Sequence, residues 1–185
     1  VAPTTVGVAA DAHVSLAELA LRVKDLDGAA TELERARALA GRSGSLFDHF
    51  RVLLGDAGLY LARRQHRLAR VTAEAAERAT REAGIITEAL RARAIAAEAA
   101  ALQGDRMAAW TYLDVVLGEP CMADPGRVHR GDEVVSACAR ALHALGDERH
   151  GALLDRQAES VRGAMIQAYA AALSASPRRG GEARG

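Results

Sequence analysis

The feature that most constrains the fold of this chain is a pattern of small residues that recurs about every forty residues. Three segments carry small or medium-sized apolar residues at positions i, i+4 and i+7, and a fourth, more degraded segment begins at Gly151 and keeps Ala158. The first three sets are Ala29, Leu33 and Ala36; Ala69, Ala73 and Ala76; and Ala109, Leu113 and Val116. Residues at this spacing share one helix face, where small side chains let a neighbouring helix approach closely. A fixed period of this length is typical of stacked helical repeats.

The composition is that of an all-helical domain built with few bulky side chains. Half of the 185 residues are apolar but only 3% are aromatic, and much of the apolar half is alanine, the best helix former. The 24 basic and 24 acidic residues balance, so no overall charge attracts nucleic acid or an anionic membrane. No apolar run approaches the ~20 residues that a bilayer requires, and residues 1–10 lack the basic segment of a secretion signal. We therefore predict a cytoplasmic chain without direct nucleic-acid or membrane partners.

Apolar periodicity and turn residues predict alternating helices and tight turns. The predicted helices cover residues 9–22, 29–40, 45–64, 67–83, 85–102, 107–117, 125–145 and 148–173. Asp124 is predicted to cap the seventh helix, with Pro125 in its first turn and Gly131 as a weak point inside it. We expect a flexible N-terminal extension over residues 1–8, a helical domain over 9–173, and a disordered Gly- and Arg-rich tail over 174–185.

Each predicted unit consists of a helix, a short turn, and a second helix that bears the small residues. The turns are predicted at Lys24–Asp25, Arg64–Gln65, Gly104–Asp105 and Gly146–Asp147. This arrangement resembles the tetratricopeptide repeat, with a period longer than the usual one of about 34 residues. It is similar to the variant in the sensor domains of bacterial signal-transducing ATPases and large transcriptional regulators. The resemblance implies an all-α, right-handed superhelix of antiparallel helix pairs with about four repeats.

The sequence contains few residues that indicate catalysis. Phosphate-binding glycine loops, zinc-protease motifs, CxxC pairs and nucleophile elbows are missing, and the six histidines include no i, i+4 pair for a metal. Cys121 and Cys138 have no metal-like spacing and are predicted to be free thiols in a reducing compartment. Trp110 is predicted to fill a gap in the core, with a partner anchor as the alternative. We therefore expect no enzymatic activity, no cofactor and no metal.

The resemblance also implies a binding surface. In tetratricopeptide superhelices the first helix of each repeat lines a concave groove that contacts a peptide, and the Lys and Asn residues that clamp a C-terminal carboxylate in some relatives are missing here. The positions carried over onto this chain are Glu18, Arg22, Arg51, Leu54, Gly58, Arg91, Glu98, Arg140 and His143. The resulting hypothesis is an interaction or sensor module of a bacterial regulatory protein, which binds a protein or peptide, or another domain of its own polypeptide. The alternatives are a homodimerising scaffold and a small-molecule enzyme on a helical framework.

Overall fold

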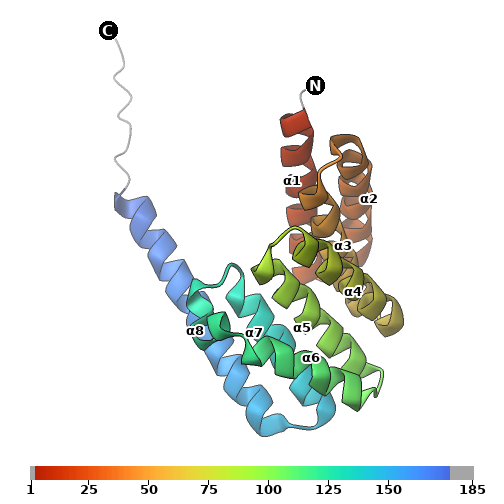
Figure 1. The fold of residues 1–185 in the computed structure, drawn as a ribbon. Coiled ribbons are helices and arrows are strands. Elements are labelled where there is room, and N and C mark those ends of the chain that lie inside the picture. The colour runs from red at the N-terminus through yellow and green to blue at the C-terminus, as the bar shows by residue number, and fades with distance from the viewer. Residues whose placement is uncertain (1–2, 176–185) are drawn as a thin grey trace.

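The structure, a computed structural model, describes residues 3–175, which form eight α-helices and no β-strand (Figure 1). The helices are α1 (Pro3–Arg22), α2 (Leu26–Ser43), α3 (Leu46–Ala62), α4 (His66–Glu82), α5 (Ile86–Leu102), α6 (Arg106–Gly118), α7 (Gly131–Leu145) and α8 (Glu148–Ala175). Two short 3-10 helices, η1 (Pro120–Ala123) and η2 (Pro125–Arg127), connect α6 to α7. The prediction of an all-α chain is confirmed.

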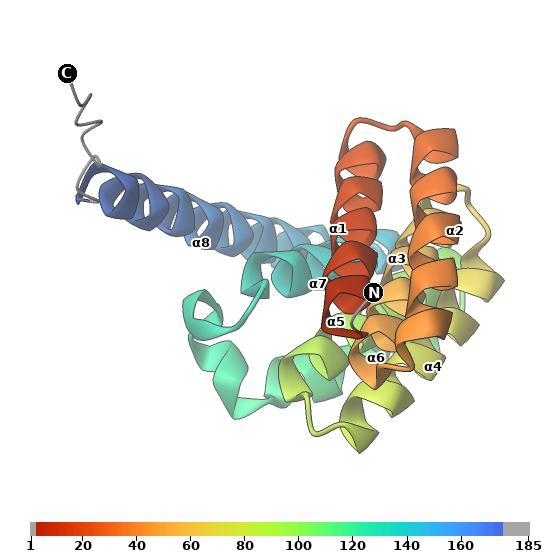
Figure 2. The same ribbon diagram turned by 90° about the horizontal axis from the view of Figure 1, so that it is seen from above.

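Most helices pack against their neighbours in the sequence, as successive antiparallel pairs. From α1 to α6 each helix contacts the next, and α7 contacts α8. The step from α6 to α7 is the exception, because α7 packs mainly on α5 and only slightly on α6. The far half of α8 extends away from the other helices (Figures 1 and 2).

The turn between the two helices of each pair has a common geometry. A residue with positive φ stands in each turn, followed directly by the residue before the second helix. These residues are Lys24 (φ 64°), Arg64 (φ 58°), Gly104 (φ 80°) and Gly146 (φ 84°). Asp25 and Asp105 then accept a hydrogen bond from a backbone N–H in the first turn of α2 and α6, which satisfies donors that a helix N-terminus leaves free. Such a turn reverses the chain without a long loop and holds the pair antiparallel.

The small residues that the repeat pattern singled out are buried between helices. All members of the first three sets are buried, and so is Ala158 in the fourth. Ala73 and Ala76 lie in one apolar cluster with Phe50 and Leu54 of α3. The prediction that these positions face neighbouring helices is therefore confirmed.

Enlarging the alanines at these contacts is expected to destabilise the fold. Ala73→Leu and Ala109→Leu each place three extra carbon atoms at a position with no exposed surface, and each should lower the free energy of unfolding by about 1–3 kcal/mol. Urea denaturation measures the change. Ala38→Leu on the exposed side of α2 is the control and should shift stability by less than about 0.5 kcal/mol. Equal stabilities for all three variants would show that these contacts tolerate bulk.

The first helix begins earlier than predicted. Its start is Pro3 rather than residue 9, so residues 3–8 of the expected extension are helical. Val6 and Ala10 are buried, so the apolar periodicity of α1 runs through the predicted boundary. The remaining part of the expected extension, and residues 176–185 of the expected tail, lie outside the described residues.

The predicted start of the seventh helix is wrong. The side chain of Asp124 forms no capping hydrogen bond, η2 ends at Arg127, and α7 begins only at Gly131. Arg130, immediately before α7, has φ 54°. A Cβ atom on Gly131 would lie 2.0 Å from the carbonyl oxygen of Pro125. This glycine is therefore a point of close approach between the connector and α7, rather than a weak point inside a longer helix.

Candidate functional site

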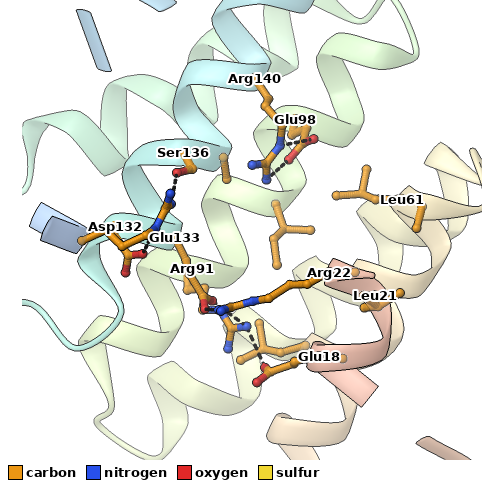
Figure 3. A pocket seen from close by; sticks show the side chains of 17 residues that line it. Glu18, Leu21, Arg22, Leu61, Arg91, Glu98, Asp132, Glu133, Ser136 and Arg140 are labelled. Atoms are coloured by element: carbon orange, nitrogen blue, oxygen red, sulfur yellow. Dashed lines mark hydrogen bonds and ion pairs between the residues drawn. The ribbon is translucent and has the colours of Figure 1, made fainter. Parts of the chain in front are cut away.

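A cavity of about 720 Å³ lies among α1, α3, α5, α7 and α8 (Figure 3). We call it the groove. Its lining includes seven of the nine predicted groove residues: Glu18, Arg22, Leu54, Gly58, Arg91, Glu98 and Arg140. The prediction thus identified side chains that the structure does bring together, from four different helices.

The floor of the groove is apolar. Leu54, Gly58 and Leu61 line it from α3 and Ile95 from α5, and the three α3 residues have the i, i+4, i+7 spacing of a single helix face. A Cβ atom on Gly58 would lie 3.4 Å from Cδ1 of Leu21. Any side chain larger than alanine at this position would therefore extend into the groove.

Ion pairs between arginine and acidic side chains surround this floor. Arg140 donates two hydrogen bonds of 2.7 Å to the carboxylate of Glu98, and Figure 3 shows this pair across α7 and α5. Arg22 donates to Glu133 at 3.0 Å from the exposed end of α1. On the α8 side, Arg162 donates to Asp132 at 3.2 Å. A bound segment would therefore meet positive and negative groups on each side of an apolar strip.

Glu18 is the centre of a largely buried charge cluster at one end of the groove. Arg130 donates to both of its carboxylate oxygens at 2.7 Å, Arg91 donates at 2.8 Å, and Nη1 of Arg51 lies 3.6 Å from Oε1. Burial alone would raise the pKa of Glu18, but the hydrogen bond from Arg130 and the charges of Arg91, Arg130 and Arg51 outweigh it and lower the pKa to about 2. We call these four residues the Glu18 cluster; it ties α1, α3, α5 and the start of α7 together.

Two further carboxylates extend the Glu18 cluster around Arg91. Nη2 of Arg91 lies 2.9 Å from Oε2 of Glu133, and its Nη1 lies 3.6 Å from Oε2 of Glu88. Neither that nitrogen nor that oxygen of Glu88 forms a hydrogen bond, although both atoms are buried. The guanidinium group of Arg91 therefore lies within ion-pair distance of three carboxylates, those of Glu18, Glu133 and Glu88.

The structure places Arg51 and Arg91, which were both predicted as groove contacts, largely inside the protein. They are only 5% and 8% exposed, and their charges are directed to carboxylates of the same chain. Removing one partner of such a buried pair is strongly destabilising, so these arginines contribute to holding the helices together. Arg51 does not line the groove at all.

His143 also lies outside the groove lining. Its Nδ1 is 2.6 Å from a carboxylate oxygen of Glu148 and its Nε2 is 2.9 Å from one of Asp155. Hydrogen bonding to Asp155 and then to Glu148 raises its pKa. The imidazole therefore links α7 to the start of α8.

The sequence analysis missed Arg130 and Glu133. A signal for Glu133 was available, because it lies two helical turns before Arg140 on the same face of α7, as Arg91 does before Glu98 on α5. Arg130 had no such signal. Its role depends on the left-handed backbone before α7, in a region predicted to be continuous helix.

The prediction that Trp110 fills a gap in the core is wrong. It keeps 37% of its surface exposed on α6. Its neighbour Tyr112 is the more embedded aromatic residue, since its hydroxyl donates to Glu74 and its ring lies under the guanidinium of Arg70, 5.7 Å from the centroid. Trp110 thus belongs to the edge of the core.

The described residues give little sign of metal or thiol chemistry. No group of three or more His, Cys, Asp or Glu side chains within residues 3–175 is arranged to hold a metal ion. Of the two free cysteines, Cys121 is exposed and Cys138 is buried; burial raises the pKa of the Cys138 thiol to about 12. None of the described helices has the length and apolar character needed to cross a membrane.

Comparisons with protein-family models, with curated proteins and with solved structures found no match for this chain. Its possible function therefore has to be argued from the groove and the surfaces around it.

Proposed function

We propose that this chain is a non-enzymatic interaction or sensor module that binds a protein or peptide segment in the groove. The observation that carries the proposal is the apolar floor of Leu54, Gly58 and Ile95, which is flanked by arginine–glutamate ion pairs. Concave sites with an apolar lining and a few polar groups are the usual places of ligand binding. A groove open along several helices suits an elongated ligand better than a compact one.

The rim can supply charged groups to a ligand at low cost. The side chain of Arg22 is 67% exposed in its pair with Glu133, and exposed ion pairs contribute only about 0–1 kcal/mol to stability. Arg22 can therefore turn from Glu133 to a carboxylate on a bound segment, whereas Arg140 is held by the buried carboxylate of Glu98. The segment that fits best carries apolar residues in its middle and charges of both signs beside them.

The wider proposal is that the helix pairs form a right-handed superhelix of about four tetratricopeptide-like repeats, within a cytoplasmic bacterial regulator. The shared turn geometry and the buried small residues at equivalent positions support it. In such an array the first helices of the pairs line one side, and α1, α3, α5 and α7 supply every residue that lines the groove except Arg162 of α8.

The experiment uses a displayed library of random peptides, selected on the purified protein and then titrated by calorimetry or fluorescence. In Gly58→Trp the indole should fill the groove and weaken the selected peptide at least about tenfold, the equivalent of about 1.4 kcal/mol. Leu68→Trp on α4, an exposed position outside the groove lining, is the matched control and should bind like the unmodified protein.

A second variant tests the rim. Arg22→Glu should leave the fold intact, because this side chain is exposed, and should change the salt dependence of peptide binding. If the selected peptides bind Gly58→Trp as tightly as they bind the control, the binding surface lies elsewhere and the proposal that peptides bind in the groove is wrong.

A further inference from the structure

One face of α1 is apolar, exposed and free of charge. It consists of Val8, Ala12, Leu16 and Leu19 of α1 and of Val23, which directly follows the helix, and their spacing places them on a single stripe. The four larger side chains are between 50% and 77% exposed. We call this set the α1 stripe. Isolated exposed apolar residues are ordinary, but a continuous row of them marks an interaction site.

The equivalent face is buried on every later first helix. Positions are matched by their distance from the left-handed turn residue that follows each helix, at Lys24, Arg64, Gly104 and Gly146. Ala12, Leu16 and Leu19 then correspond to Val52, Asp56 and Leu59 on α3, to Ala92, Ala96 and Ala99 on α5, and to Val134, Cys138 and Ala141 on α7. All nine of these residues are buried.

On α3 and α5, the second helix of the preceding pair covers that face. Val52 of α3 lies in one apolar cluster with Ala36 and Ala40 of α2. Ala92 and Ala96 of α5 lie in another with residues of α4. α1 has α2 and α3 as its main neighbours, and both lie on its opposite side, where Val6, Ala10 and Ala17 are buried. The α1 stripe therefore has the position and character of a helix-packing face, but no described helix covers it.

We propose that the α1 stripe binds the α1 stripe of a second copy of this chain, with the two helices antiparallel about a two-fold axis. A two-fold interface requires one patch that is complementary to itself. With the axis near Leu16, Ala12 faces Leu19 of the partner subunit and Val8 faces Val23 of the partner subunit. A large side chain then meets a small one on each side of the axis, as in well-packed helix interfaces.

Charge also favours this occupant. The α1 stripe is uncharged, so two copies bring no like charges together across the axis. Exposed apolar residues of comparable size also lie on α8, Leu153, Ile166 and Tyr169 among them, but that helix also exposes Arg149, Arg156 and Glu159. Covering these charged groups with an apolar face would cost their hydration. The stripe is about 23 Å long at 1.5 Å per residue. A single helix pair of this length buries less than the roughly 1,600 Å² of a standard interface, so the dimer should be weak, with dissociation in the micromolar range.

Sedimentation velocity over a range of concentrations up to about 1 mM tests the proposal. The unmodified protein should shift from monomer to dimer, and Leu16→Arg should remain monomeric over the whole range. Leu68→Arg and Ile166→Arg, which charge exposed apolar positions on α4 and α8, should dimerise like the unmodified protein. A monomeric unmodified protein, or dimerisation of Leu16→Arg, would overturn the proposal. Loss of the dimer only in Ile166→Arg would overturn it as well and assign the interface to α8.

A cross-linking variant gives an answer that does not depend on losing a dimer. In a Cys121→Ser background, which removes the exposed native thiol, Leu16→Cys should form a disulfide-linked dimer on mild oxidation because the two copies of this position meet at the axis. Leu68→Cys in the same background is the control and should not. Equal cross-linking of the two variants would contradict the proposed axis. Neither experiment depends on the groove, so the groove proposal stands or falls separately.

Discussion

Glu18→Gln is expected to lower the free energy of unfolding at neutral pH by about 3–5 kcal/mol, the range for removing one partner of a buried ion pair. Arg130, Arg91 and Arg51 all direct their charges to this carboxylate. Glutamine keeps the size of the side chain but removes the negative charge, which leaves the guanidinium groups of the two buried arginines, Arg51 and Arg91, with less compensation. Urea denaturation monitored by circular dichroism measures the change.

The pH dependence of stability provides a second test of the Glu18→Gln substitution. The pKa of Glu18 is about 2 in the folded chain against an ordinary value of 4.5, so its stabilising effect is fully present above about pH 4.5 and is lost as the pH falls towards 2. The difference in stability between the unmodified protein and Glu18→Gln should shrink over this interval. Glu159→Gln, at an exposed position of α8, is the matched control and should change stability by less than about 0.5 kcal/mol at any pH. A Glu18→Gln protein as stable at pH 7 as this control would mean that the cluster does not hold the helices together.

Gly131→Ala is expected to destabilise the fold by about 3 kcal/mol, at the upper end of the range for adding a methyl group to a packed site. The new Cβ would lie 2.0 Å from the carbonyl oxygen of Pro125 and 3.2 Å from Cβ of Val128. Because the nearest atom belongs to the backbone, no side-chain rotation relieves the clash. The connector between η2 and α7 must move instead, and with it Arg130 of the Glu18 cluster.

The control for Gly131→Ala is Gly163→Ala, for which we expect a change in stability of the opposite sign. Gly163 lies inside α8, and a Cβ there meets no atom within 4 Å. Gly163→Ala should therefore stabilise the protein by about 0.5–1 kcal/mol through helix propensity alone. Thermal melting of both variants measures the two changes in stability. A Gly131→Ala protein that gains stability like Gly163→Ala would place Gly131 inside an unhindered helix, as the sequence analysis predicted.

The sequence alone identified most of the groove because helix periodicity is local. Leu54 and Gly58, or Arg91 and Glu98, share a helix face whatever the helix packs against, and the turn residues set how those faces line up from one pair to the next. The same reasoning could not tell a charge at the groove surface from one buried in the protein. Arg91 and Arg140 were both predicted to contact a partner in the groove, yet the first is only 8% exposed and the second has a side chain that is 54% exposed.

What the sequence determined by itself is the all-helical fold, the pairing of consecutive helices and the small residues at their contacts, since each follows from spacing along a few turns of chain. Only the tertiary structure decided that Glu18 meets Arg130, 112 residues away, and that α7 packs on α5 rather than on α6. These contacts depend on how the helix pairs turn relative to one another and on the close approach at Gly131. Both are properties of the assembled core, in which segments far apart along the chain pack together, and no local pattern specifies them.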